Sequence, residues 1–166
     1  YTPGEQPRDM EYVKLNTNES PFPPSPEVVK VISGEEVEKL KLYSDPEGKD
    51  LCDAIAAHFG YKRENILLGN GSDEILAFAF FAFCAGGKCI FPEISYGFYP
   101  VYAELVGTDA EKAPLRDDFS IDINDYIGKN TTIVIANPNA PTGIALSRDQ
   151  IEEIVKSNPD NVVIID

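Results

Sequence analysis

The sequence predicts an α/β fold, in which a mostly parallel sheet carries helices on both faces. Residues 131–135 form a continuous run of β-branched and apolar side chains, the pattern of a strand covered on both faces. Two further short apolar runs, at 88–91 and 162–165, are separated from it by segments with helical patterning. Strands that alternate with helices are typical of parallel sheets, because the helix returns the chain to the start of the next strand.

The composition is that of a globular protein, with 166 residues, 43% apolar and 10% aromatic side chains, and a net charge of −14. The 14 Lys and Arg residues are scattered, which argues against nucleic-acid or anionic-membrane partners, since both require clustered positive charge. No apolar run is long enough to span a membrane, and the polar amino terminus lacks the apolar core of a signal peptide. We therefore expect a cytoplasmic protein.

The cysteines and the histidine give no pattern typical of a metal site. Cys52, Cys84 and Cys89 show no C-x-x-C spacing, and His58 is the only histidine. We expect reduced, structural thiols and no bound metal.

The amino-terminal residues 1–34 are expected to form an extended arm and a first helix, which begins with Ser25 as N-cap and Pro26 at its first position. Residues 35–166 would then form a second, larger domain. Within the arm, the polar stretch at 16–19 has the composition of a solvated turn.

The segment after the arm combines a weakly helical stretch at 35–42 with a turn at 43–48. A helix is predicted next, with Leu51, Ala54, Ile55 and His58 on its apolar face, so that the imidazole of His58 is expected to be partly buried. A short strand or extended segment is expected at 65–68.

Gly69–Glu74 opens an apolar helix and has the features of a phosphate-binding turn. The free N–H groups and the positive dipole end of a helix attract phosphate, and glycine lets the backbone approach it closely. The segment is not a Walker A loop, because no Gly-Lys-Ser/Thr follows. A plain helix start with Ser72 as N-cap is the alternative interpretation.

The helix that follows is apolar around its whole circumference at 77–83, which indicates burial in a core or in a subunit interface. Tyr96 lies in the loop at 92–97, after the predicted strand at 88–91, and is either a site residue or a core tyrosine. A strand is predicted at 110–115, and a loop with a short acidic helix at 117–126. Ser147 and Gln150 form a capping box at the start of a last helix.

The loop at 136–143 is stiff, because each of its two prolines fixes its own φ and restricts the preceding residue. It follows the central predicted strand directly. Open α/β sheets bind ligands at the carboxyl ends of their strands, so this loop is a candidate ligand site.

The sequence NPNAPTG of this loop resembles the corresponding loop of the class I/II, fold-type I aminotransferases, which use pyridoxal 5'-phosphate, and in detail that of histidinol-phosphate aminotransferases. Further matching motifs occur in the family's order and spacing: KLNTNESPFPPSPEV at 14–28, LYSDPEG at 42–48, LLGNGSDEI at 67–75, PEISYGFY at 92–99 and VVIID at 162–166. The resemblance covers essentially the whole chain but only part of the family fold. It implies an amino-terminal arm and an incomplete large domain.

The resemblance also implies how the cofactor is held. In the family, backbone N–H groups of the residues matching Gly71, Ser72 and Asp73 bind the cofactor phosphate, and the aromatic residue matching Tyr96 stacks on the pyridine ring. The carboxylate matching Asp166 pairs with the protonated pyridine nitrogen, which makes Asp166 the candidate catalytic residue.

Two more sites follow from the resemblance. The tyrosine matching Tyr43 reaches the cofactor phosphate of the other subunit, which implies a homodimer, and the segment containing Asn18 and Glu19 borders the substrate pocket. One position departs from the family, because Ala140 replaces an asparagine that donates to the 3'-oxygen of the pyridine ring. Asn139, or a water molecule, is the candidate replacement donor.

The function implied is transamination between histidinol phosphate and 2-oxoglutarate, which gives imidazole acetol phosphate and glutamate in histidine biosynthesis. The family's Schiff-base lysine and substrate-binding arginine are expected beyond Asp166, so we expect this chain to be an incomplete and inactive part of the enzyme. The alternatives are a related enzyme, such as a threonine-phosphate decarboxylase or an aromatic aminotransferase, and a non-catalytic phosphate- or nucleotide-binding α/β domain.

Overall fold

The computed structural model describes residues 4–166, and its internal contacts divide the chain into two compact units. One unit ends at Leu68 and the other comprises Gly69–Asp166. The division falls 34 residues after the boundary expected at 34/35. The assignment of residues 35–68 to the larger domain of an intact enzyme therefore stays a prediction.

The amino-terminal unit is an open chain of short helices. Helix α1, Pro26–Ile32, begins as predicted, since the Oγ of Ser25 accepts a hydrogen bond from the N–H of Val28. The remaining elements are α2 (Glu35–Glu38), the 3-10 helix η1 (Lys39–Lys41), α3 (Lys49–Phe59) and the 3-10 helix η2 (Arg63–Asn65). Residues 65–68, expected to be extended or a strand, pair with no strand among the described residues.

The orientation predicted for α3 is wrong. The helix buries Cys52 and Ala56, while Leu51 and His58 are exposed. Cys52 and Ala56 are four residues apart and therefore lie on one face of the helix, which differs from the predicted face. It is this face, with its two small side chains, that is buried. His58 is thus a surface residue of this unit.

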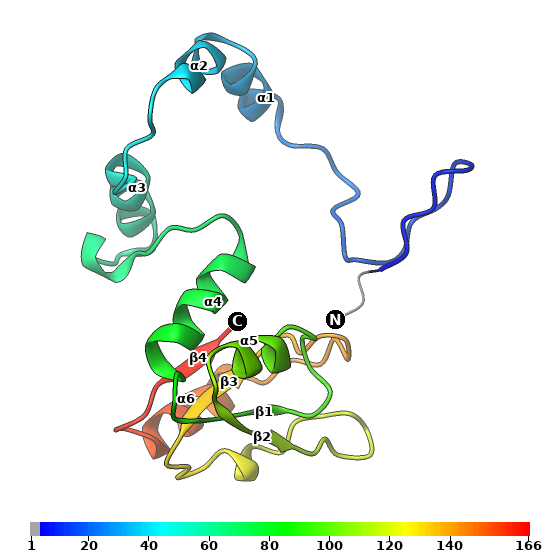
Figure 1. Ribbon diagram of the computed structural model, residues 1–166, viewed down its shortest axis with the longest axis vertical. Helices are drawn as coiled ribbons and strands as arrows, with labels where there is room; N and C mark the ends of the chain where they lie inside the picture. Colours follow the sequence, from blue (N-terminus) through cyan, green and yellow to red (C-terminus); the bar gives the residue numbers. More distant parts are fainter. Residues whose placement is uncertain (1–3) are drawn as a thin grey trace. The chain divides into compact units, whose positions relative to one another are not determined.

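The second unit contains a four-stranded parallel sheet in the order β2-β1-β3-β4 (Figure 1). Its strands are β1 (Lys88–Pro92), β2 (Asp109–Ala113), β3 (Thr132–Ile135) and β4 (Val163–Ile165). As predicted, β3 is buried along its whole length. The apolar run at 162–165 predicts another buried strand, but within the described residues β4 lies at the edge of the sheet and is half-buried or exposed.

Helices cover both faces of the sheet, as the sequence predicts. Helices α4 (Ser72–Phe83) and α5 (Tyr99–Leu105) pack on one face, where Phe80 and Tyr99 join Val134 in a core cluster. Helix α6 (Arg148–Ser157) packs on the other face, where Ile154 joins Ile133 and Ile135 (Figure 1). The predicted capping box starts α6, and a 3-10 helix, η3 (Ile123–Asp125), lies in the loop after β2.

Helix α4 is only partly covered within this chain. It buries Leu76 and Phe80, whereas Phe78, Phe81 and Phe83 remain about half exposed. Within the described residues, no helix is both long enough and apolar enough to cross a bilayer. The three cysteines are free and buried.

Truncation of Ile154 should destabilise the protein far more than truncation of its neighbour Val155. Ile154 is 0% exposed and Val155 is 46% exposed, so only the first change leaves a cavity against β3. We expect Ile154→Ala to lower the free energy of unfolding by about 2–5 kcal/mol and Val155→Ala by less than about 1 kcal/mol. Urea denaturation of the two variants measures the difference, and equal losses would contradict this packing.

Candidate functional site

The candidate site lies at the carboxyl ends of β1, β3 and β4. In a parallel sheet these ends meet at one edge, which brings together the loop with Tyr96, the loop at 136–143 and Asp166. The backbone of Asp166 is held there by two hydrogen bonds of 2.9 Å, one donated to Ile135 and one accepted from Asn137. Asp166 is itself exposed.

The loop at 136–143 is held by its own polar groups. The side chain of Asn137 accepts from the N–H of Leu146 at 2.7 Å and donates to its carbonyl at 3.3 Å. Across the turn, the N–H of Gly143 donates to the carbonyl of Asn139 at 2.7 Å, and Gly143 has a φ of +73° that favours glycine. The stiffness predicted from the prolines is thus reinforced by side-chain contacts.

Asn139 is 1% exposed, and its amide nitrogen already donates two hydrogen bonds within the chain. Its Nδ2 donates to the carbonyl of Ile94 at 2.9 Å and to Oγ1 of Thr142 at 3.3 Å, while its Oδ1 has no hydrogen-bond partner in the described chain. The carbonyl of Ile94 can only accept, so the nitrogen must face it. These contacts leave Asn139 with a free acceptor and do not favour the donor role expected of it, and Ala140 has no donor to offer.

The amino terminus of α4 has the features of an anion site. Gly71 is the N-cap, not Ser72, and no side chain caps the helix. Gly71 has a φ of +83°, and a Cβ placed on it would meet nothing within 4 Å. The first-turn N–H groups, which include those of Ser72 and Asp73, have no partner within the helix and can bind an anion from the space beside Gly71.

Three tyrosines spaced three residues apart bind the two acidic residues of the site. The hydroxyl of Tyr96 donates to Oδ1 of Asp73 at 2.7 Å, and that of Tyr102 donates to Oδ1 and to the carbonyl oxygen of Asp73 at 3.1 Å. Tyr99 donates to Oδ2 of Asp166 at 2.7 Å. The start of α4 and the end of β4 are therefore tied to the same segment, and Asp73 turns its carboxylate toward hydroxyl donors.

Burial and these carboxylates raise the pKa values of two of the tyrosines, Tyr99 and Tyr102. Burial, together with the hydrogen bond to Asp73, raises the pKa of Tyr102 to about 12. Burial and Asp166 raise the pKa of Tyr99 still further above its ordinary value. Sequence reasoning missed both residues, although the spacing of 96, 99 and 102 places three hydroxyls on one short segment.

Three expected site residues lie in the amino-terminal unit, and their roles stay predictions. Tyr43 is fully exposed, Asn18 has a φ of +51°, and Glu19 forms an ion pair with Lys14.

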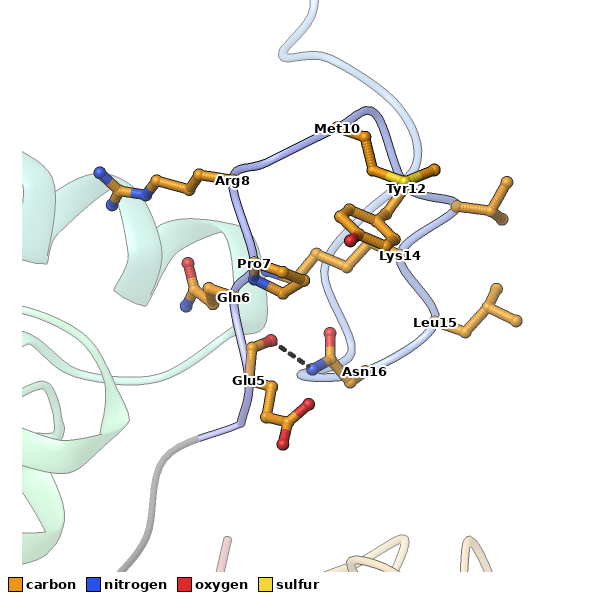
Figure 2. Close-up of a pocket in the computed structure, with 10 residues that line it drawn as sticks. Glu5, Gln6, Pro7, Arg8, Met10, Tyr12, Lys14, Leu15 and Asn16 are labelled. Atoms are coloured by element: carbon orange, nitrogen blue, oxygen red, sulfur yellow. Dashed lines mark hydrogen bonds between the residues drawn. The ribbon is translucent and has the colours of Figure 1, made fainter.

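The same unit contains a cavity of about 690 Å³ between the two sides of the loop that runs from Glu5 to Asn16. Figure 2 shows its lining side chains and the hydrogen bond of 2.9 Å from Asn16 Nδ2 to the carbonyl of Glu5. All of its lining residues are exposed, and none of them is a residue expected in the site.

A sequence model of the family "Aminotransferase class I and II" matches residues 10–166, which is almost the entire chain. The chain belongs to this aminotransferase family. It is 55% identical over its whole length to a histidinol-phosphate aminotransferase of Brachyspira hyodysenteriae, and 47% identical to one of Clostridium acetobutylicum.

The fold is also that of solved aminotransferases. The structure of histidinol-phosphate aminotransferase from Sinorhizobium meliloti in complex with pyridoxal-5'-phosphate matches 90% of this chain, with a TM-score of 0.81 and 25% identity. That match covers 42% of the solved chain, and the two curated relatives are each covered over 47% of their length. This aminotransferase chain therefore spans about half the length of its relatives.

The raised pKa of Tyr102 predicts a loss of stability at high pH. An unfolded tyrosine ionises near pH 10, so the buried neutral form contributes stability below that pH, and the contribution is lost as the pH rises toward about 12. Urea denaturation between about pH 9 and pH 12 should show this decline, and Tyr102→Phe should make it shallower. Exposed Tyr61 is the control, and a Tyr61→Phe variant with the same effect would contradict the assignment.

Proposed function

We propose that the protein carrying this chain is a pyridoxal-phosphate-dependent aminotransferase that converts histidinol phosphate and 2-oxoglutarate to imidazole acetol phosphate and glutamate. One observation carries the proposal: the start of α4, which no side chain caps, and the carboxylate of Asp166 are bound by tyrosines of the same segment, residues 96–102. Tyr102 binds Asp73 at the start of α4, and Tyr99 binds Asp166. The names of the relatives that are 55% and 47% identical supply the substrate.

The residues fit the cofactor. The open space at Gly71 and the free first-turn N–H groups of Ser72 and Asp73 suit its phosphate, which is an anion. Asp166 suits the protonated pyridine nitrogen, because a carboxylate favours a cationic partner. When bound, pyridoxal phosphate supplies an electron sink for the bond changes at the substrate's α-carbon.

The remaining residues would orient the ligands. Tyr96 is half-buried in the carboxyl-end loop after β1, a position from which its ring can stack on a planar ligand. Asn139 would offer its unpartnered Oδ1 to a donor, which revises the donor role expected from the sequence. Asn18 and Glu19 would border the substrate in the assembled enzyme.

A homodimer in the cytoplasm completes the proposal. The half-exposed Phe78, Phe81 and Phe83 on α4 give an apolar surface suited to a subunit interface. Tyr43 is fully exposed in this chain, as expected of a residue that binds the phosphate of a neighbouring subunit.

Asp166→Asn in the full-length enzyme should leave pyridoxal phosphate binding detectable and lower kcat by about a hundredfold or more, because a neutral amide holds the pyridine proton poorly. Glutamate formation from histidinol phosphate and 2-oxoglutarate measures the effect. Asp160→Asn, on an exposed turn, is the control. A wild-type enzyme inactive on histidinol phosphate would overturn the substrate, and a normal kcat in Asp166→Asn would overturn the role of Asp166.

Tyr43→Phe should lower cofactor affinity by about 1.5–3 kcal/mol, the range for a hydrogen bond to a charged group. A mixed dimer tests whether Tyr43 acts across the interface, by pairing a Tyr43→Phe subunit with an Asp166→Asn subunit. If it does, one active site carries both substitutions and the other carries neither, so about half of the wild-type activity survives. Activity well below half would mean that Tyr43 serves its own subunit.

A further inference from the structure

We propose that Tyr99 is a positioning residue that holds the carboxylate of Asp166 in the orientation needed to meet the cofactor's pyridine nitrogen. The proposal rests on the proposed function, since it assigns Asp166 to that nitrogen. It adds Tyr99, a residue whose role is not evident from the sequence alone.

Tyr99 contacts the carboxylate of Asp166 directly. The Tyr99 hydroxyl lies 2.7 Å from Oδ2 of Asp166, the distance of a strong hydrogen bond to a charged acceptor. Asp166 follows β4 and is exposed, and nothing else in the described chain donates to its side chain. Without Tyr99 the carboxylate would be free to rotate about two torsions. With it, one oxygen is fixed and Oδ1 remains available to a ligand.

The ring of Tyr99, which carries the donor hydroxyl, is held rigidly in the core. Tyr99 is 0% exposed, and its ring contacts those of Phe80 and Phe91, with centroids 6.3 and 5.8 Å away. Tyr96 packs edge-on against it with a centroid distance of 5.7 Å. Because the ring is packed on these sides, its hydroxyl has a fixed position. The hydrogen bond to that hydroxyl then limits the rotation of the Asp166 side chain.

Packing alone does not require the hydroxyl of Tyr99. Phenylalanine would fill the same volume, and a buried hydroxyl is unfavourable unless it is hydrogen-bonded. Tyr126 shows the contrast, because it is equally buried on the other face of the sheet and its hydroxyl has no hydrogen-bond partner among the described residues. Tyr126→Phe is therefore a control matched in burial and in chemistry.

The experiment uses the full-length enzyme and four variants: Tyr99→Phe, Tyr126→Phe, Asp166→Asn and the double variant Tyr99→Phe/Asp166→Asn. We measure the dissociation constant of pyridoxal phosphate and the absorption spectrum of the bound cofactor, then kcat and KM, with thermal unfolding as the check on folding. Tyr99→Phe should weaken cofactor binding and lower kcat by about tenfold or more, with little change in KM, as expected for a lost hydrogen bond to a charged group. Tyr126→Phe should leave all of these values near wild type.

The double variant separates positioning from packing. If Tyr99 acts through Asp166, removal of its hydroxyl has no further effect once Asp166 is Asn, so the double variant should match Asp166→Asn within about twofold. If the effects of Tyr99→Phe and Asp166→Asn instead multiply in the double variant, the positioning role is overturned. It is also overturned if the Tyr99→Phe enzyme cannot be distinguished from the Tyr126→Phe enzyme. Neither result would overturn the proposed function. A wild-type enzyme that fails to bind pyridoxal phosphate would overturn the proposed function, and this proposal with it.

Discussion

The structure depends on the burial of β3 between two layers of helices. Its four residues, Thr132–Ile135, pair with β1 on one side and β4 on the other, and their side chains enter both core clusters. A strand in this position must be apolar on both faces, which explains the unbroken β-branched run. Because β3 is fixed on every side, the loop after it begins from a rigid point, and the backbone of Asp166 is positioned by hydrogen bonds to that same strand and loop.

Three tyrosines in the segment 96–102 bind the acidic residues of the candidate site. Tyr96 lies in the loop before α5, and Tyr99 and Tyr102 lie within the helix. Their hydroxyls donate hydrogen bonds to the carboxylates of Asp73 and Asp166. A carboxylate such as that of Asp73 beside the proposed phosphate site is unfavourable, since both groups are anions. Two hydroxyl donors to Asp73 reduce that cost, and the helix amino terminus supplies the opposing positive potential.

Several local features could not be read from the pattern, for identifiable reasons. His58 lies on a plausible helical stripe, but α3 buries the neighbouring stripe of Cys52 and Ala56, because helix periodicity does not reveal which face meets a partner. The apolar run of β4 has the pattern of a central strand, whereas β4 lies at the edge of the described sheet and is half-buried or exposed there. Asn139 was expected to donate, yet its nitrogen is taken by the carbonyl of Ile94, a residue 45 positions away in the sequence.

The sequence by itself determined the α/β class, the positions of most of the helices and of the four parallel strands, and the family, because periodicity, capping residues and loop motifs are local. The residues 137–143 and 69–75 carried the family resemblance without any knowledge of the contacts between them. Only the tertiary structure decided that Gly71 caps α4, that Tyr102 binds Asp73 and that Tyr99 binds Asp166. Those contacts join residues 29 and 67 positions apart, and such distances close only when the sheet orders its strands and brings their carboxyl ends to one edge.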